Sequence, residues 1–137
     1  MSIKPSESKV IYRILFIVYL LCLAYLCFGN LASDAKNISG WLPDAIMGIP
    51  TDKCIHFCMF FPFVLLGLPA IRKDNVWRAL ATIIIAAVSA AFAFEFLQDV
   101  LTDYRTTDPW DFVANITAIT FSSILMAVIC LIRERRV

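Results

Sequence analysis

Four long apolar stretches divide this chain, and polar residues gather at their ends. The apolar runs cover about residues 10–29, 52–71, 76–101 and 109–132. Twenty residues of α-helix rise roughly 30 Å, which matches the hydrocarbon thickness of a bilayer. A helix satisfies its own backbone hydrogen bonds in lipid, and no alternating strand pattern occurs. The pattern therefore predicts an all-α, integral membrane four-helix bundle that forms one domain, 1–137.

The composition agrees with a membrane protein. Of the 137 residues, 61% are hydrophobic and 17% charged, and the mean hydropathy is +0.79. These values lie far from those of an ordinary soluble domain. All five cysteines lie in or beside apolar stretches, so we expect no disulfide framework.

Local signals mark where two of the helices begin. Asp108 suits a helix N-cap, Pro109 suits the first helical position, and Asp111 follows within the first turn, where a negative charge is favoured. Thr51 is a plausible N-cap for the second span. The connection before it, 30–51, contains several helix breakers and is predicted to be irregular, either folded onto the bundle or lying with its apolar side in the headgroup region.

The distribution of basic residues predicts the orientation. Nine of the twelve Lys and Arg residues lie near the N-terminus, in the turn after the second span or near the C-terminus: Lys4, Lys9, Arg13, Arg72, Lys73, Arg78, Arg133, Arg135 and Arg136. By the positive-inside rule, both termini are cytoplasmic and the 30–51 and 102–110 loops face outward. The short basic C-terminal tail has no folded basic surface around it, so we expect no nucleic-acid partner.

Polar residues concentrate at the outward ends of the second, third and fourth spans. The second begins with Asp52, Lys53 and His56, the third ends with Glu95, Gln98 and Asp99, and the fourth begins with Asp108, Asp111 and Asn115. At 1.5 Å per residue, these groups lie at a similar shallow depth. Ionisable residues within apolar spans usually face a protein interior or a wet cavity, and they indicate a functional site.

This ordered set resembles the VanZ-like family of bacterial membrane proteins. The resemblance rests on Asp52-Lys53-x-x-His56-Phe57, on Glu95-x-x-Gln98, and on Arg105 followed by Asp111 and Asn115, within a four-span frame. Where the family usually has a glycine three residues after the asparagine, this chain has Ala118. The family takes its name from a protein associated with resistance to the glycopeptide teicoplanin, and its members have no settled chemical activity.

The resemblance implies a multi-pass protein of the bacterial cytoplasmic membrane with a polar pocket facing the outer leaflet. The candidate ligand-binding residues are Asp52, Lys53, His56, Glu95, Gln98, Arg105, Asp111 and Asn115. The expected partners are membrane lipids. A lipid-linked envelope intermediate would suit the antibiotic association, with Lys53 and Arg105 holding a phosphate and the grooves between spans holding its chain.

Two other interpretations compete with lipid binding. In the first, the polar residues form a structural network in which Arg105 or Lys53 neutralises Glu95 and Asp111 and the set fixes helix register. In the second, the protein is a membrane-embedded hydrolase or transferase acting on an envelope lipid, with Glu95, His56 and Asp111 as candidate catalytic groups. No serine or cysteine is recognisably coupled to His56.

The sequence says less about a bound metal, about transport activity and about the oligomeric state. A divalent metal is compatible with Asp52, His56, Glu95 and Asp111 as ligands, since oxygen-rich sets suit magnesium, calcium or manganese and one histidine also suits zinc. Transport has little support, because no internal repeat or pair of broken helices is present. Four spans of this size are compatible with a homo-oligomer.

Overall fold

The computed structural model describes residues 5–28, 43–71, 75–101 and 108–135. The elements in chain order are α1 (Pro5–Phe28), β1 (Ala45–Ile46), β2 (Ile49–Pro50), α3 (Thr51–Ile71), α4 (Val76–Leu101) and α5 (Pro109–Glu134). Four helices are long and apolar enough to cross a membrane. The four predicted spans are therefore confirmed as helices, with ends that differ from the predicted ones by up to five residues.

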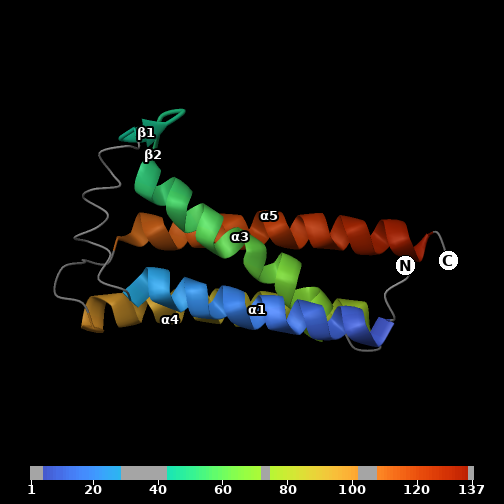
Figure 1. Ribbon diagram of the computed structural model, residues 1–137. Coiled ribbons are helices and arrows are strands. Elements are labelled where there is room, and N and C mark those ends of the chain that lie inside the picture. Colours follow the sequence, from blue (N-terminus) through green and yellow to red (C-terminus); the bar gives the residue numbers. More distant parts are fainter. Residues whose placement is uncertain (1–4, 29–42, 72–74, 102–107, 136–137) are drawn as a thin grey trace.

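Helix α3 is the centre of the bundle. It contacts α1, α4 and α5, and it crosses obliquely between α5 on one side and the pair formed by α1 and α4 on the other (Figure 1). Its buried side chains form the middle of the hydrophobic core with small residues of α4 and α5. The most deeply buried members are Leu23, Phe60, Val64, Ala87, Ala91, Ala118 and Ile119.

Small residues allow the helices to approach closely. Ala87 and Ala91 on α4 and Ala118 on α5 are completely buried. On α3, a Cβ atom at Gly67 would lie 2.5 Å from Cδ1 of Ile83. Close backbone approach is typical of helix interfaces in membranes, where packing rather than the hydrophobic effect drives association. These alanines and Gly67 therefore allow the close contacts of α4 with α3 and α5.

A small β-hairpin precedes α3, so the bundle is not purely α-helical. Ala45 pairs with Pro50 and Ile46 with Ile49. The turn residues Met47 and Gly48 have φ angles of 53° and 82°, the left-handed conformation of a tight hairpin turn. Part of the predicted irregular connection is therefore ordered, and the remainder up to residue 42 lies outside the described residues.

The hairpin is joined directly to the first turn of α3. The Thr51 backbone N–H donates to the Asp44 carbonyl at 3.1 Å, and the Thr51 hydroxyl donates to the Pro43 carbonyl. Thr51 was predicted as an N-cap, but it is the first residue of the helix and its hydroxyl reaches back to the hairpin. The hairpin therefore has a defined position beside the polar end of the bundle.

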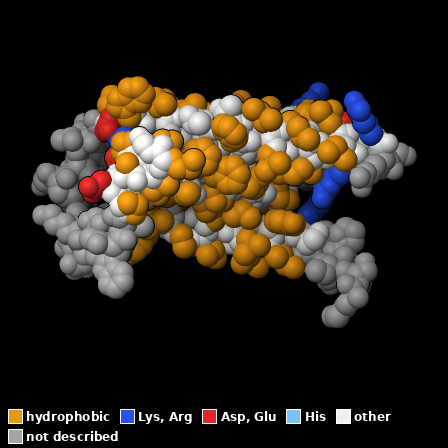
Figure 2. All heavy atoms as spheres, turned by 90° about the horizontal axis from the view of Figure 1, so that it is seen from above, with side chains coloured by type: hydrophobic (Ala, Val, Ile, Leu, Met, Phe, Trp, Pro, Cys, Tyr) orange, Lys and Arg blue, Asp and Glu red, His pale blue; other side chains and the backbone are white. Residues whose placement is uncertain are grey.

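The surface is divided along the bundle axis. Figure 2 shows an apolar belt between an end with red carboxylates and an end with blue basic side chains. Large apolar residues such as Leu21, Ile85 and Phe121 are more than half exposed within the belt. The start of α1 and the end of α5 lie together at the basic end (Figure 1). This surface suits a multi-pass membrane protein, since isolated soluble domains rarely expose such a belt.

Candidate functional site

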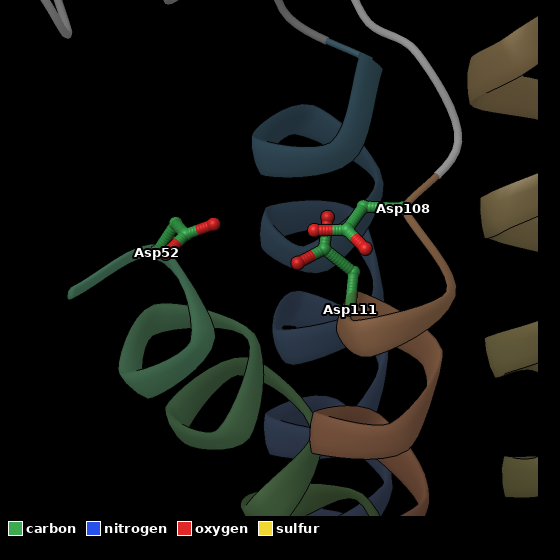
Figure 3. Close-up of side chains that lie close together, drawn as sticks. All are labelled: Asp52, Asp108 and Asp111. Carbon is green, nitrogen blue, oxygen red and sulfur yellow. The ribbon is translucent and has the colours of Figure 1, made fainter. Parts of the chain in front are cut away.

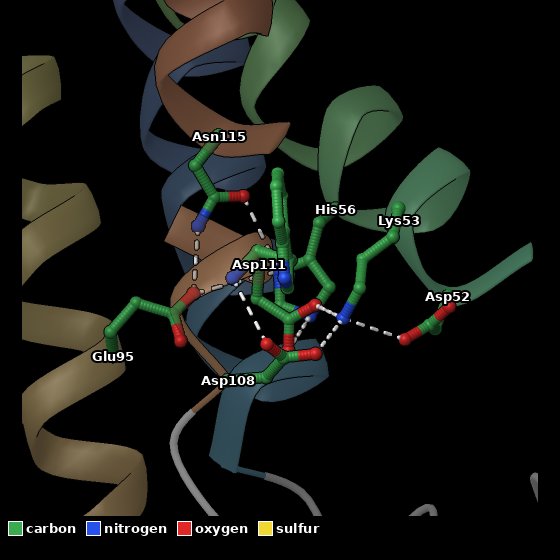
Figure 4. A network of polar contacts seen from close by, with 8 residues as sticks. Asp52, Lys53, His56, Glu95, Asp108, Asp111 and Asn115 are labelled. Atoms are coloured by element: carbon green, nitrogen blue, oxygen red, sulfur yellow. Dashed lines mark hydrogen bonds and ion pairs between the residues drawn. The ribbon is translucent and has the colours of Figure 1, made fainter. Parts of the chain in front are cut away.

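Three helix ends supply the polar side chains of the site. The first two turns of α3 carry Asp52, Lys53 and His56, the last part of α4 carries Glu95, and the first two turns of α5 carry Asp111 and Asn115. These ends lie at the same end of the bundle, away from the start of α1 (Figure 1). The topology brings these six predicted site residues into one polar network, shown in Figure 4.

The start of α5 is fixed by its cap. Asp108 has an extended backbone, and its side chain accepts a hydrogen bond from the Trp110 N–H at 3.0 Å, with Pro109 as the first helical residue. This confirms the predicted helix start. The same carboxylate also faces α3, so capping places Asp108 within the site.

Lys53 is the centre of an outer cluster, which we define as Asp52, Lys53, Asp108 and Asp111. Its ammonium donates to the carboxylates of Asp108 and Asp111 and lies 2.9 Å from Oδ2 of Asp52. An ammonium has three N–H donors, and here each faces a different carboxylate. The outer cluster therefore joins α3 to α5 and carries three acidic groups against one basic group.

His56, Glu95 and Asn115 form an inner cluster, which is buried beneath the outer one. The Asn115 amide donates to Oε1 of Glu95 at 2.8 Å, and its oxygen lies 3.3 Å from Nδ1 of His56. Nδ1 of His56 is also 3.6 Å from Oε1 of Glu95. The inner cluster thus connects α3, α4 and α5 through one asparagine.

The two clusters meet at Asp111. Its Oδ2 lies 3.5 Å from Nε2 of His56, while its Oδ1 accepts from Lys53. Polar contacts therefore run without a break from Asp52, which is exposed, to Glu95, which is buried. Within the described part of the chain, every buried side-chain nitrogen or oxygen has a hydrogen-bond partner.

Hydrogen bonds from α3 and from the start of α5 favour the ionised form of Asp108. The Lys53 ammonium and the Trp110 backbone N–H both donate to Asp108 and hold the pKa of that carboxyl below its usual range. Asp108 lies outside the membrane-crossing segments. With three carboxylates and one ammonium, the outer cluster has a formal charge of −2.

A large groove opens beside the outer cluster, between α3, α5 and the hairpin. Its volume is about 1030 Å³. It is lined mainly by apolar side chains, and its charged lining residues are Asp52, Lys53 and Asp108 at one end. The other lining residues are Ile46, Ile49, Pro50, Cys54, Phe57, Cys58, Trp110, Val113, Ala114 and Thr117. One end of the groove is therefore charged, and the rest of its length is mainly apolar.

The inner cluster does not line this groove. His56, Glu95, Asp111 and Asn115 are absent from its walls. His56 and Asn115 are instead packed among the three helices, 5% and 0% exposed. The candidate catalytic groups Glu95, His56 and Asp111 therefore lie behind the groove, whereas Asp52 and Lys53 line it.

Asp52, Asp108 and Asp111 are the described carboxylates whose arrangement could hold a metal ion. Their ligand atoms lie within 4.8 Å of one another (Figure 3). This set shares Asp52 and Asp111 with the predicted metal ligands and has Asp108 in place of His56 and Glu95. The Lys53 ammonium binds the same three carboxylates, so a metal there would compete with it.

Two predicted site residues are not located by the structure. Arg105 lies outside the described residues, and so does the side chain of Gln98, although its backbone is part of α4. Asp108 was predicted as a cap and not as a site residue. The signal that could have found it is its spacing, because it lies one turn before Asp111 at the same helix end.

Comparison with known proteins gives no match for this chain. No protein-family model matches it, and no curated protein or solved structure is significantly similar to it.

Proposed function

We propose that this chain is a VanZ-like, multi-pass protein of the bacterial cytoplasmic membrane that binds an envelope amphiphile in the groove between α3 and α5. The ligand is a phosphate-bearing lipid or a lipid-linked cell-envelope intermediate. Through this ligand, the protein influences susceptibility to teicoplanin-type glycopeptides. The family and antibiotic parts of the proposal rest on the sequence resemblance, whereas the binding part rests on the groove.

The groove is the observation that carries the proposal. It is about 1030 Å³ in volume and apolar over most of its length, with charged groups at one end only. Sites of this size with a few placed polar groups are typical of small-molecule binding. An acyl or polyprenyl chain would occupy the apolar part, between Phe57 and Val113. The headgroup would then lie beside Asp52 and Asp108.

The charge distribution supports the orientation in the membrane. Lys9, Arg13, Arg78, Arg133 and Arg135 lie at the end of the bundle where α1 begins and α5 ends, and Lys53 lies at the other end. The positive-inside rule then puts both termini in the cytoplasm. With this orientation, the groove opens towards the outer leaflet.

The geometry favours binding over turnover. His56 faces Asn115 and Glu95 through Nδ1 and Asp111 through Nε2. A general base must reach the proton that it removes, and none of these side chains lines the groove. A purely structural role remains a good account of the inner cluster alone, because it joins three helices.

The proposal predicts that filling the groove removes a bound lipid. Ala114 lines the groove, so Ala114→Phe would occupy the space of the chain. We expect native mass spectrometry of the mildly solubilised protein to show lipid retention reduced by about tenfold, a loss of about 1.4 kcal/mol of binding free energy. Total lipid extraction then identifies the species that the wild type retains.

Ala93→Phe is the matched control. Ala93 is exposed on α4 and does not line the groove, so the same increase in size should leave retention unchanged. Equal retention by the wild type and both variants, or retention by none, would contradict groove binding. The polar residues would then be better described as a scaffold.

A further inference from the structure

The hydrogen-bonding capacity of the outer cluster points to the headgroup that the groove accepts. Lys53 is its single basic residue, and its ammonium faces Asp52, Asp108 and Asp111. Since an ammonium has three donors, this arrangement leaves Lys53 no donor for a phosphate without breaking an existing ion pair.

The carboxylates, in contrast, retain acceptor capacity. Each ionised carboxylate has two oxygens and about four acceptor positions. Asp52 and Asp108, the two that line the groove, have side chains 60% and 41% exposed. One Asp108 oxygen accepts from Trp110 and the other from Lys53, so each oxygen has capacity for a further hydrogen bond. The headgroup end of the groove is thus rich in acceptors.

The charge of this end agrees with the hydrogen-bonding argument. The outer cluster combines three carboxylates with one ammonium and has a formal charge of −2. The exposed hairpin beside it adds no basic side chain in residues 43–50. The described residues at this end would therefore attract a cationic group and repel an anionic group that lacks a cation.

We infer that the groove selects an amphiphile whose headgroup carries an ammonium, with the chain against α3 and α5 and the ammonium beside Asp52 and Asp108. This inference rests on the proposed function, because it names the headgroup of the ligand in the same groove. Charge-assisted N–H···O bonds to the two exposed carboxylates provide the recognition. Lys53 remains bound to Asp111, whose side chain is 17% exposed, and keeps the cluster assembled.

The test compares two lipids that share their chains and their phosphate. The detergent-solubilised full chain is offered dioleoyl phosphatidylethanolamine and dioleoyl phosphatidylglycerol in equal amounts, and retention is measured by native mass spectrometry. We expect the ethanolamine lipid to be preferred by about fivefold, the scale of one exposed ion pair. The phosphate is common to both lipids, so the preference reports the ammonium.

Asp52→Asn tests the recognition directly. Its side chain is exposed and forms an ion pair with Lys53, so the fold should tolerate the change, and we expect the preference to fall to about twofold. Asp44→Asn is the matched control, because Asp44 is exposed near the same end but does not line the groove. It should retain the full preference.

The outcomes separate this inference from the proposed function. If retention is lost in Ala114→Phe but the two lipids bind equally, or if the glycerol lipid is preferred, groove binding stands and the ammonium inference is overturned. If Asp44→Asn lowers the preference as much as Asp52→Asn, the effect is one of general surface charge and the inference also fails. If Ala114→Phe retains both lipids as the wild type does, groove binding itself fails.

Discussion

The outer and inner clusters use similar groups in very different surroundings. In the outer cluster, the Asp52 and Asp108 side chains are 60% and 41% exposed. In the inner cluster, the side chains of His56 and Glu95 are 6% and 8% exposed, and Asn115 is fully buried. Both clusters are hydrogen-bonded networks between helices. They differ in whether a side chain can exchange its hydrogen-bond partner for water, salt or a ligand.

This difference separates binding from architecture. An exposed ion pair contributes little to stability because water and salt screen it, but it is free to exchange partners. A buried group that loses its partner costs much more, because nothing replaces the lost hydrogen bond. We therefore expect substitutions in the inner cluster to lower stability more than substitutions in the outer cluster, and we expect recognition to depend on the exposed carboxylates of the outer cluster.

The largest effect is expected for Asn115→Ala. The substitution removes the amide donor of Glu95 and the neighbour of His56, and it leaves a small cavity. Loss of a hydrogen bond to a buried acidic group, with the cavity, should lower the free energy of unfolding by about 3 kcal/mol. Reversible unfolding in mixed detergent micelles measures this change.

Thr120→Ala is the control for that experiment. Thr120 is exposed on the same helix, and its hydroxyl bonds to the Ile116 carbonyl within α5. Its loss should cost less than about 0.5 kcal/mol. Comparable destabilisation by both variants would mean that the inner cluster has no special role in holding α3, α4 and α5 together.

An intermediate effect is expected for Lys53→Met. The change keeps much of the side-chain volume but leaves three neighbouring carboxylates without their cation. We expect a loss of about 2 kcal/mol, below the range for fully buried pairs because two of the carboxylates are exposed. Lys9→Met, at an exposed position in α1 near the other end, should have little effect.

Adding calcium provides a second test of the Lys53→Met variant. Without the ammonium, the three carboxylates provide oxygen ligands within 4.8 Å of one another. Millimolar calcium chloride should therefore restore part of the stability of Lys53→Met and leave the wild type unchanged. Stabilisation of the wild type by calcium would show instead that a metal ion displaces the Lys53 ammonium from the three carboxylates.

The smallest effect is expected for Asp108→Asn, and it depends on pH. Asparagine still suits the N-cap, so the substitution removes mainly the charge facing Lys53. The pKa of Asp108 is lowered in the folded protein. Its ionised form therefore stabilises the fold fully above the unfolded pKa of about 3.9, and this contribution is lost as the pH falls through the lower folded pKa.

Unfolding of the wild type and Asp108→Asn is compared at neutral pH and at the lowest pH that the detergent tolerates. We expect the wild type to be slightly more stable at neutral pH and the difference to shrink with acid. A difference that does not change with pH would assign the effect to the cap and not to the ion pair.

The sequence predicts the helices of this fold because long apolar runs and the Asp108-Pro109 cap are local signals. It also predicts which helix ends carry the polar groups. It does not predict the partners. Asp52 and His56 are one turn apart on α3, yet Asp52 is exposed and His56 is buried, because burial depends on how α3 packs against α4 and α5.

The hairpin shows another limit of local reasoning. Gly48 suits the second position of a tight turn, but Met47 before it adopts a positive φ that favours asparagine or glycine. The two-residue strands are too short for an alternating pattern to be visible. Their conformation depends on the hydrogen bond between Thr51 and Asp44 at the start of α3, a contact that the sequence pattern does not reveal.

The central position of α3 also has a consequence for biosynthesis. Its polar residues Lys53 and His56 leave the ribosome before their partners in α4 and α5 exist. A charge at the centre of an inserting helix costs about 2.5 to 3.5 kcal/mol, whereas Lys53 is the third residue of α3 and can extend its ammonium beyond the helix end. The contacts that join α3 to α5 can therefore form only after the last helix has been synthesised, and a chain truncated before α5 would lack them.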